Sequence, residues 1–454
     1  MRGFTRFNLF VAFAFTVMAD PVSSVAYAIE AALDQLHGDL SHLVVTMALV
    51  VLTIAVVAGG YHQLIGRFPN GGGGAEGLAA AFGEGWAFLP VGALLVDFTL
   101  TIAVSCAAGA AALIAYLPQL GAHRTLLALG LAIAVGLGTL LGHRARVAFA
   151  TATLVFIALA LVLIVRGALH PSGPGAGAVV GDSAIVPVLL AMPLGMALAT
   201  GVEAPSNAIA QLGQLDDRGR RLFGQLTLWL MLGIVGLLTI SLAVLGVRLG
   251  VGPPRPDSTL LADIAGRVTG KDPMFAAFQL ASAALLLAAA ASSYLAGSGL
   301  LKALALHGTD GGLLPRPLGR VNRFYAPPAG LAVMLVTATG LIALARGRDQ
   351  EIVQYYAVAV FASFLGALVA CAVLAWRDRR WIAFAVDVLG VALVAMVLIL
   401  NMRRAGPLIA LAAAGTISLA LYAIWVRRGR PSGVTTLTSE LLPMPDRAPG
   451  SPRG

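Results

Sequence analysis

Twelve long apolar segments separated by short polar stretches constrain this chain more than any other feature. A helix needs about 20 apolar residues to cross a hydrocarbon core roughly 30 Å thick, because it rises about 1.5 Å per residue. The chain is 59% hydrophobic and 11% charged, unlike an ordinary soluble domain. We therefore predict an all-α membrane protein with about 12 transmembrane helices. The segments are residues 5–37, 43–66, 85–118, 125–142, 147–167, 183–212, 222–247, 274–304, 327–345, 352–376, 382–401 and 407–426.

The net charge of +9 comes from short basic clusters between these segments. This distribution argues against a nucleic-acid partner, since no single domain is basic. With the N-terminus in the cytoplasm, about two thirds of the 30 Lys and Arg residues fall on the cytoplasmic side. We therefore expect a multi-pass inner (plasma) membrane protein with both termini cytoplasmic. The first twenty residues also fit a signal peptide, so cleavage of the first segment stays open.

Polar residues and proline interrupt the first and sixth segments, at ADPVSSVAY (19–27) and ATGVEAPSN (199–207). Interrupted helices at matching positions of two five-helix halves are typical of inverted-repeat transporters. One such break alone is weak evidence, because many membrane helices carry proline as a kink. We predict a LeuT-like 5+5 inverted repeat with broken helices 1 and 6. Its parts are a first repeat at 1–167, a second at 168–376, two accessory transmembrane helices at 377–430 and a disordered cytoplasmic tail at 431–454.

Four carboxylates, Asp20, Glu30, Asp97 and Glu203, lie inside or near the ends of predicted spans. An ionised acid at a helix centre costs about 2.5 to 3.5 kcal/mol on the insertion scale, so acids facing lipid are untenable. These side chains must face a cavity, bind cations or carry protons for part of a cycle. The pattern favours a transporter without specifying the solute.

The third segment places Asp97, Thr101 and Ser105 at i, i+4 and i+8, along one face of a helix. Their oxygens are suited to line an ion path. The alternative is that both hydroxyls bond the carbonyls of the preceding turn, as Ser and Thr often do in membranes.

The two breaks carry oxygen-bearing side chains of their own. Asp20 and Tyr27 flank the first break, while Thr200 and Glu203 lie at the second. Together with freed backbone carbonyls they are suited to a hard cation. Two alternatives stay open, namely that Asp20 caps the following half-helix and that Tyr27 is an interfacial anchor.

Signatures of enzymes are absent from the sequence. The seven histidines form no metalloprotease pattern, no Walker lysine follows GGGG at 71–74, and no G-x-S-x-G occurs. We expect neither enzymatic activity nor a cofactor. The expected partners are the bilayer and a transported cation, small amine or amino acid, with a homodimer as a further option.

Five segments together resemble the amino acid/polyamine/organocation (APC) permease superfamily, and in particular its KUP-type and KimA-like potassium importers. They are DPVSSVAYAIE (20–30), RFPNGGGG (67–74), LLVDFTLTIAVS (94–105), TGVEAPSN (200–207) and YAVAVFASF (356–364). The resemblance implies a LeuT-like fold and alternating access. It also implies that the potassium sites or the proton coupling involve Asp20, Tyr27, Asp97, Thr101, Ser105, Thr200, Glu203 and Tyr356. Among these, Asp20 and Asp97 are expected to bind potassium, and Glu203 and Asp97 are expected to carry the coupled proton.

The sequence departs from this branch at several positions. Ala75 and Glu76 stand where relatives often have Ala-Tyr, and SSYLAGSG (292–299) lacks an acidic residue that relatives often carry. Ala367 and Leu368 replace the usual Ser-Gln, and only about 25 residues follow the last segment, where nucleotide-regulated relatives have a large domain. These departures put both substrate and regulation in doubt.

The sequence is compatible with two kinds of substrate, a cation and an amino acid or polyamine. Amino acid carriers of this superfamily commonly present a Gly-Ser-Gly stretch at the first break, where bare amides hold the substrate carboxylate, whereas this chain has Asp-Pro-Val-Ser-Ser. We predict proton-coupled potassium or cation uptake. The alternatives are a proton-coupled amino acid or polyamine permease and, with less support, a non-transporting membrane scaffold.

Overall fold

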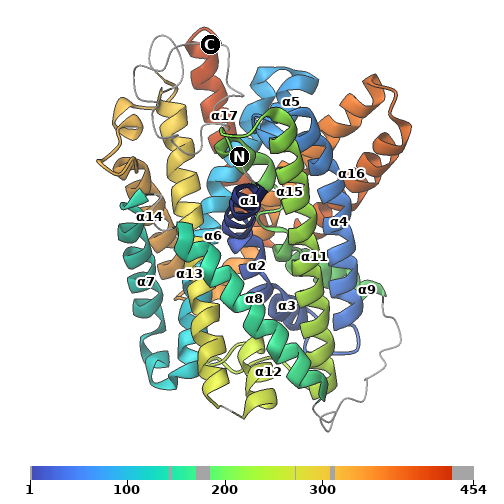
Figure 1. Ribbon diagram of the computed structural model, residues 1–454, viewed down its shortest axis with the longest axis vertical. Coiled ribbons are helices and arrows are strands. Elements are labelled where there is room, and N and C mark those ends of the chain that lie inside the picture. Colours follow the sequence, from blue (N-terminus) through green and yellow to red (C-terminus); the bar gives the residue numbers. More distant parts are fainter. Residues whose placement is uncertain (1–2, 143–145, 170–184, 271, 307–311, 432–454) are drawn as a thin grey trace.

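The computed structural model describes residues 3–142, 146–169, 185–270, 272–306 and 312–431, which form an all-helical bundle (Figure 1). Helices occupy each of the twelve predicted segments. The tail from residue 432 on lies outside the described residues. The principal helices are α1 Gly3–Val17, α2 Ala19–Ser23, α3 Val25–Gln35, α4 Leu43–Arg67, α5 Gly73–Phe82, α6 Phe88–Tyr116, α7 Arg124–Thr139, α8 Arg146–Leu169, α9 Ile185–Gly195, α10 Ala204–Ala208, α11 Asp217–Leu249, α12 Leu260–Thr269, α13 Pro273–Leu306, α14 Pro328–Leu344, α15 Asp349–Arg377, α16 Trp381–Asn401 and α17 Ala405–Arg427.

Ten helical segments of the described chain are long and apolar enough to cross a membrane. Two shorter apolar helices, α1 and α14, occupy the first and ninth predicted segments. The protein is thus a multi-pass membrane protein. The count of twelve crossings and the inverted repeat stay predictions.

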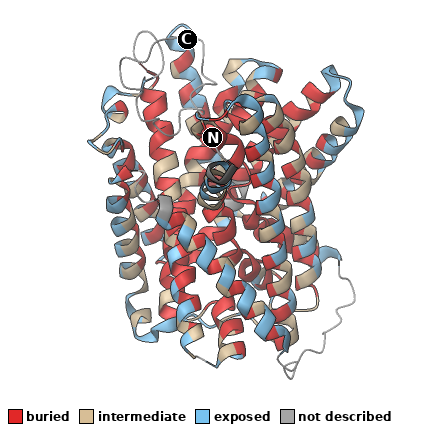
Figure 2. Cartoon of the chain, viewed as in Figure 1, coloured by how far each residue is buried: buried red, intermediate tan, exposed pale blue. Residues whose placement is uncertain are grey.

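Helix α6 lies at the centre of the bundle, where it contacts α13, α15 and α17. Figure 2 shows buried positions concentrated in the central helices, whereas α7 at the edge carries mainly exposed and intermediate residues. The predicted accessory helices belong to the same bundle, since α16 packs on α15 and α4, and α17 packs on α6 and α15. The polar residues of α6 are therefore shielded from lipid on several sides.

The first break is a pair of kinks. The helix is divided at Met18 and Ser24, and both residues keep right-handed helical dihedral angles. The Ser23 hydroxyl donates to the Asp20 carbonyl at 2.7 Å, and the Ser24 hydroxyl donates to the Pro21 carbonyl at 2.6 Å. These bonds satisfy carbonyls within the interrupted stretch, so the backbone stays coiled through the break.

The sixth segment, in contrast, unwinds. A 3₁₀ turn, η4 (Met196–Ala199), follows α9, after which Thr200 has a ψ of 135° and Gly201 a φ of 72°. The chain coils again as α10 and then as a second 3₁₀ turn, η5 (Ile209–Gln211). The left-handed conformation at Gly201 is open to glycine at little cost.

The two interrupted segments cross at this unwound stretch. A Cβ atom at Gly201 would lie 2.8 Å from Pro21 Cδ and 3.0 Å from Asp20 Oδ2. The Ser24 hydroxyl also donates to the Leu198 carbonyl at 3.3 Å. Segments 174 residues apart in sequence therefore meet in the interior of the bundle.

Candidate functional site

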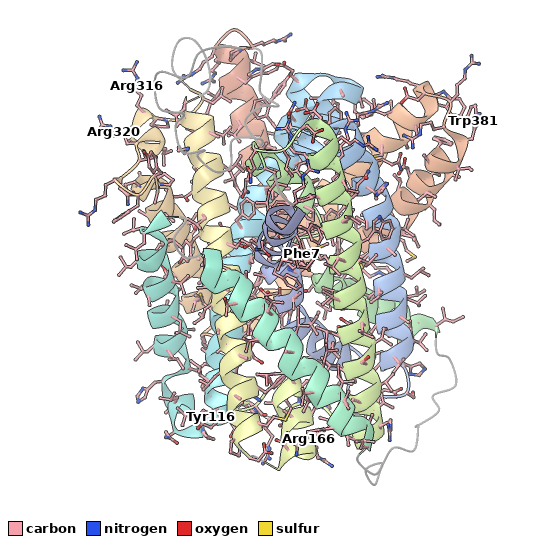
Figure 3. The ribbon with its side chains drawn as sticks, in the orientation of Figure 1. Phe7, Tyr116, Arg166, Arg316, Arg320 and Trp381 are labelled. Carbon is pink, nitrogen blue, oxygen red and sulfur yellow. The ribbon has the colours of Figure 1, made fainter. Side chains whose placement is uncertain are left out.

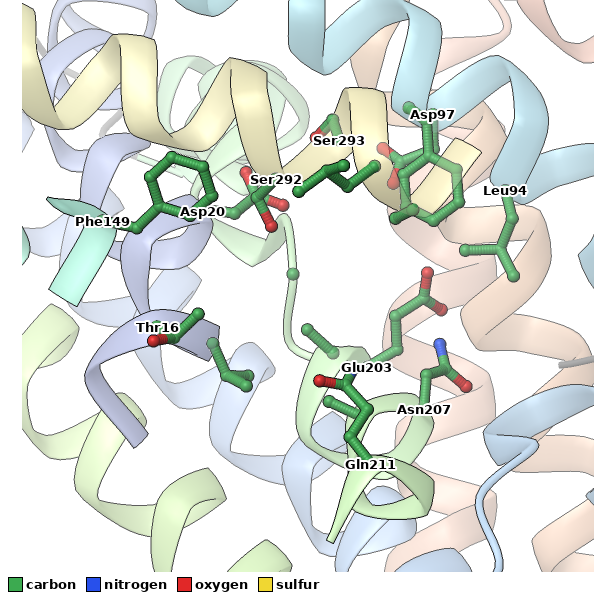
Figure 4. Close-up of a pocket in the computed structure, with 17 residues that line it drawn as sticks. Thr16, Asp20, Leu94, Asp97, Phe149, Glu203, Asn207, Gln211, Ser292 and Ser293 are labelled. Carbon is green, nitrogen blue, oxygen red and sulfur yellow. The ribbon is translucent and has the colours of Figure 1, made fainter. Parts of the chain in front are cut away.

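A cavity of about 110 Å³ lies where the two breaks meet α6 and α13 (Figure 4). Its polar lining comes from five elements, namely α1, the first break, α6, the stretch from Gly201 to Gln211, and α13. The polar residues are Thr16, Asp20, Asp97, Glu203, Asn207, Gln211, Ser292 and Ser293. No lysine or arginine lines this cavity among the described residues. Three carboxylates from distant parts of the sequence thus share one small space.

Asp20 lies in the first turn of α2 and points into the cavity near Ser292 (Figure 4). Within the described part of the chain, its Oδ1 atom is buried and has no hydrogen-bond partner. The alternative that Asp20 caps a half-helix is not seen, since α2 begins after Met18 without a side-chain cap. Asp20 is instead a cavity residue.

Asp97 approaches the cavity from α6, with Leu94 and Phe98 beside it in the lining. Its carboxyl group and that of Glu203 point toward each other across the cavity (Figure 4). Both side chains are almost completely buried, at 4% and 7% exposed. Solvent therefore screens the interaction between these two carboxyl groups poorly.

Glu203 ends the unwound stretch and is tied to two neighbouring helices. The Tyr61 hydroxyl on α4 donates to Glu203 Oε2 at 3.1 Å. The Ser363 hydroxyl on α15 donates to the same oxygen at 3.3 Å. One carboxylate oxygen thus joins the sixth segment to α4 and α15.

The other predicted residues lie behind this cavity. Tyr27, Thr101, Ser105 and Thr200 are completely buried, and none of them lines it. The Tyr27 hydroxyl lies near Thr200, whose own hydroxyl donates to the Ala197 carbonyl at 2.7 Å. The full burial of Tyr27 excludes the alternative that it is an interfacial anchor. Tyr356 belongs to α15, but its side chain lies outside the described residues.

Glu30 is separated from the site and has a structural role. Its Oε2 atom accepts a hydrogen bond of 2.8 Å from the Leu260 amide, at the start of α12. A carboxylate at a helix N-terminus satisfies a free amide and is favoured by the helix dipole. This bond accounts for one of the four carboxylates that the sequence placed in the membrane.

Sequence reasoning missed Tyr61, Ser363, Asn207 and the serines of α13. Ser363 and Asn207 belong to two of the motifs given above, and their polar groups within these motifs are the signal that identifies them. Tyr61 is one aromatic residue in a long apolar segment, and nothing in its spacing indicates that it meets Glu203, 142 residues away. Only the fold brings these two residues together.

Comparison with known families decides the classification. A family model described as amino acid permease matches residues 7–437, nearly the whole chain. The chain belongs to the amino acid permease family. This family lies within the APC superfamily, so the resemblance drawn from the sequence motifs is confirmed.

A curated relative of this chain is the potassium transporter KimA of Bacillus subtilis (strain 168). The two are 27% identical over 361 residues, which is 76% of this chain and 58% of the relative. This permease therefore spans somewhat more than half the length of that relative. Family and relative together support a membrane transporter rather than an enzyme.

Proposed function

We propose that this permease takes up a monovalent cation, potassium above all, by proton-coupled alternating access. The observation that carries the proposal is the composition of the central cavity. Asp20, Asp97 and Glu203 converge on it, and none of its described lining residues is basic. Acidic residues at bilayer depth are retained where they bind or carry positive charge.

Electrostatics favours a cation over an anionic or zwitterionic solute. A negative group about 4 Å from one carboxylate costs roughly 4 kcal/mol at an effective dielectric constant near 20, which is almost a thousandfold in affinity. A substrate carboxylate in this cavity would face three such groups. A cation gains interactions of the same size with the opposite sign.

Cavity size also favours a small ion. The cavity volume of about 110 Å³ leaves room for several water molecules or a partly hydrated ion. Pockets for drug-sized ligands are usually about 300 to 1,000 Å³. A bulky amino acid requires the cavity to expand.

Proton coupling is assigned to Glu203, with Asp97 opposite. The hydroxyls of Tyr61 and Ser363 both donate to Glu203 Oε2, an arrangement that favours the ionised carboxylate. A proton on this carboxyl group removes its charge and part of its acceptor capacity, which weakens the hydrogen bonds from the two hydroxyls. Because they belong to α4 and α15, protonation loosens the sixth segment from both helices.

The name of the Bacillus relative, a potassium transporter, supports the choice of cation. A proton-coupled amino acid or polyamine permease is the second candidate, since the matching family is described as amino acid permease. A polyamine agrees with the acidic cavity better than an amino acid does. A non-transporting scaffold is the third candidate, and the buried carboxylates argue against it because they cost stability without serving transport.

Uptake by purified protein in proteoliposomes separates these candidates. We expect labelled rubidium to accumulate under an inward proton gradient and unlabelled potassium to compete with it. Labelled amino acids and polyamines should show no uptake above empty vesicles. Uptake of an amino acid or polyamine without rubidium would establish the second candidate. No uptake of any solute by well-folded protein would favour the scaffold.

A further inference from the structure

An apolar groove on the membrane-embedded surface has no role in the proposed transport cycle. Its volume is about 650 Å³, and it lies between α14 and α17, with α6 and α13 contributing to its wall. The residues lining it on α17 run from Ile409 to Ile424, a distance of about 22 Å along the helix axis. This length lies within a hydrocarbon core of roughly 30 Å.

The groove opens toward the bilayer. Val336 on α14 and Ile409 on α17, both in its lining, are 69% and 62% exposed. Leu95 and Leu100 of α6, also in the lining, are buried. Since hydrocarbon surrounds the helices at this depth, a long aliphatic chain is the partner whose chemistry matches the lining.

The two ends of the groove differ. At one end, the Tyr355 ring lies against Gly406, where an added Cβ would be 3.2 Å from ring carbons. At the other end, the lining reaches Leu314 and Ile424. The Arg428 guanidinium donates to the Gly312 carbonyl, so the end of α17 meets the segment that contains Leu314.

The two segments at this second end are rich in arginine. Residues 312–323 and 422–431 contain six arginines and no acidic residue, the arginines being Arg316, Arg320, Arg323, Arg427, Arg428 and Arg430. Figure 3 shows Arg316 and Arg320 projecting from this end of the molecule. At the Tyr355 end, residues 345–351 and 402–406 hold four arginines and two acidic residues, and Arg348 is paired with Glu351 at 3.0 Å. The excess of positive charge is therefore larger at the second end, where it complements a phosphate group.

We propose that the groove between α14 and α17 binds an anionic phospholipid, with an acyl chain along the groove and the headgroup at the arginines of 312–323 and 422–431. The acyl chain would pack on the side of α6 that faces away from the polar cavity. Leu95 and Val96 face the groove, whereas Leu94 and Asp97 face the polar cavity. The lipid therefore supports the helix that carries Asp97.

Native mass spectrometry of the full chain in detergent, titrated with phosphatidylglycerol or phosphatidylcholine, tests this site. Ala413 and Ala420 line the groove on α17, and both are exposed. The neighbouring Ala412 is equally exposed and does not line it. We expect the parent and Ala412→Trp to retain one phosphatidylglycerol, and Ala413→Trp and Ala420→Trp each to weaken this binding at least tenfold.

A second pair of variants tests the headgroup. Arg316→Gln and Arg427→Gln together should reduce the preference for phosphatidylglycerol over phosphatidylcholine at least fivefold, while the apolar lining is unchanged. Equal binding of both lipids by the parent would overturn the headgroup assignment. Equal loss in Ala412→Trp and Ala413→Trp, or no loss in either groove variant, would overturn the groove. A dimer that only the groove variants abolish would assign the surface to a second copy of the chain.

Discussion

Glu203 differs from Asp20 in its neighbours. Two hydroxyls on separate helices donate to it, whereas Asp20 Oδ1 has no hydrogen-bond partner among the described residues. A buried carboxylate without donors gains most from a bound cation, because the ion replaces its lost hydration. A carboxylate with adjustable donors can exchange a proton while its neighbours reorient. We therefore propose that Asp20 binds the cation and that Glu203 carries the coupled proton.

The first prediction concerns cation binding by Asp97. Replacing Asp97 with Asn removes one negative charge from the cavity while keeping the shape of the side chain. We expect at least a tenfold loss of labelled rubidium uptake with normal expression, since one close charge pair is worth several kcal/mol at low effective dielectric constant. Potassium-dependent growth of a transport-deficient host should fail in parallel. Growth rescue equal to that of the parent would favour the amino acid or polyamine permease.

The second prediction concerns Glu203 and pH. In the parent, rubidium uptake should rise as the external pH falls, because more carriers load a proton from outside. Glu203→Gln cannot take up that proton, so its uptake should be flat over the same pH range. Tyr61→Phe removes one donor to Glu203 and should move the pH profile without flattening it. An unchanged profile in Glu203→Gln would remove the coupling role.

At the scale of elements, the two breaks show what the sequence does and does not reveal. The apolar segments and proline-containing interruptions were enough to place the helices and both breaks, since hydrophobic length and missing amides act locally. The sequence did not indicate whether the backbone at each break stays helical or unwinds. Ser23 and Ser24 keep the first helix coiled by bonding its carbonyls, whereas Gly201 allows the sixth to unwind.

The residues of the site could likewise be identified from the sequence only in part. Asp20, Asp97 and Glu203 could be singled out because ionisable groups in membrane segments are rare. Their meeting at one cavity depends on the crossing of segments far apart in sequence. Thr101 and Ser105 share the helical face of Asp97 but not its cavity, since they lie one and two turns deeper in the packed bundle. Periodicity gives the face of a helix, but not its depth relative to its neighbours.

The third prediction concerns Gly201, where the two broken helices cross. Gly201→Ala adds a Cβ that would lie 2.8 Å from Pro21 Cδ, in a left-handed conformation that alanine rarely adopts. We expect at least a tenfold loss of rubidium uptake. Gly233→Ala on α11 is the matched control, because no atom beyond the adjoining backbone of its own helix lies within 4 Å of the added Cβ. Comparable losses in both variants would mean that the crossing is not specifically required.

At the scale of the whole molecule, the distribution of charge predicts orientation. Lys and Arg are enriched in the segments assigned to the cytoplasm, which include Arg316 and Arg320 at one end of the bundle. Tyr116 and Arg166 lie at the opposite end (Figure 3). Because basic residues are retained on the cytoplasmic side during insertion, the end with Arg316 should face the cytoplasm. Orientation also determines the direction in which the cavity loads its cation.

The fourth prediction tests this orientation by thiol labelling in intact cells. Both native cysteines, Cys106 and Cys371, are buried, so the parent should react little with a membrane-impermeant maleimide. Gln119→Cys, in the exposed turn after α6, should label from outside, whereas Arg320→Cys should label only after the membrane is permeabilised. The opposite pattern would invert the topology and reverse the proposed direction of transport. Labelling of both positions from outside would mean that the helices between them do not cross the membrane as proposed.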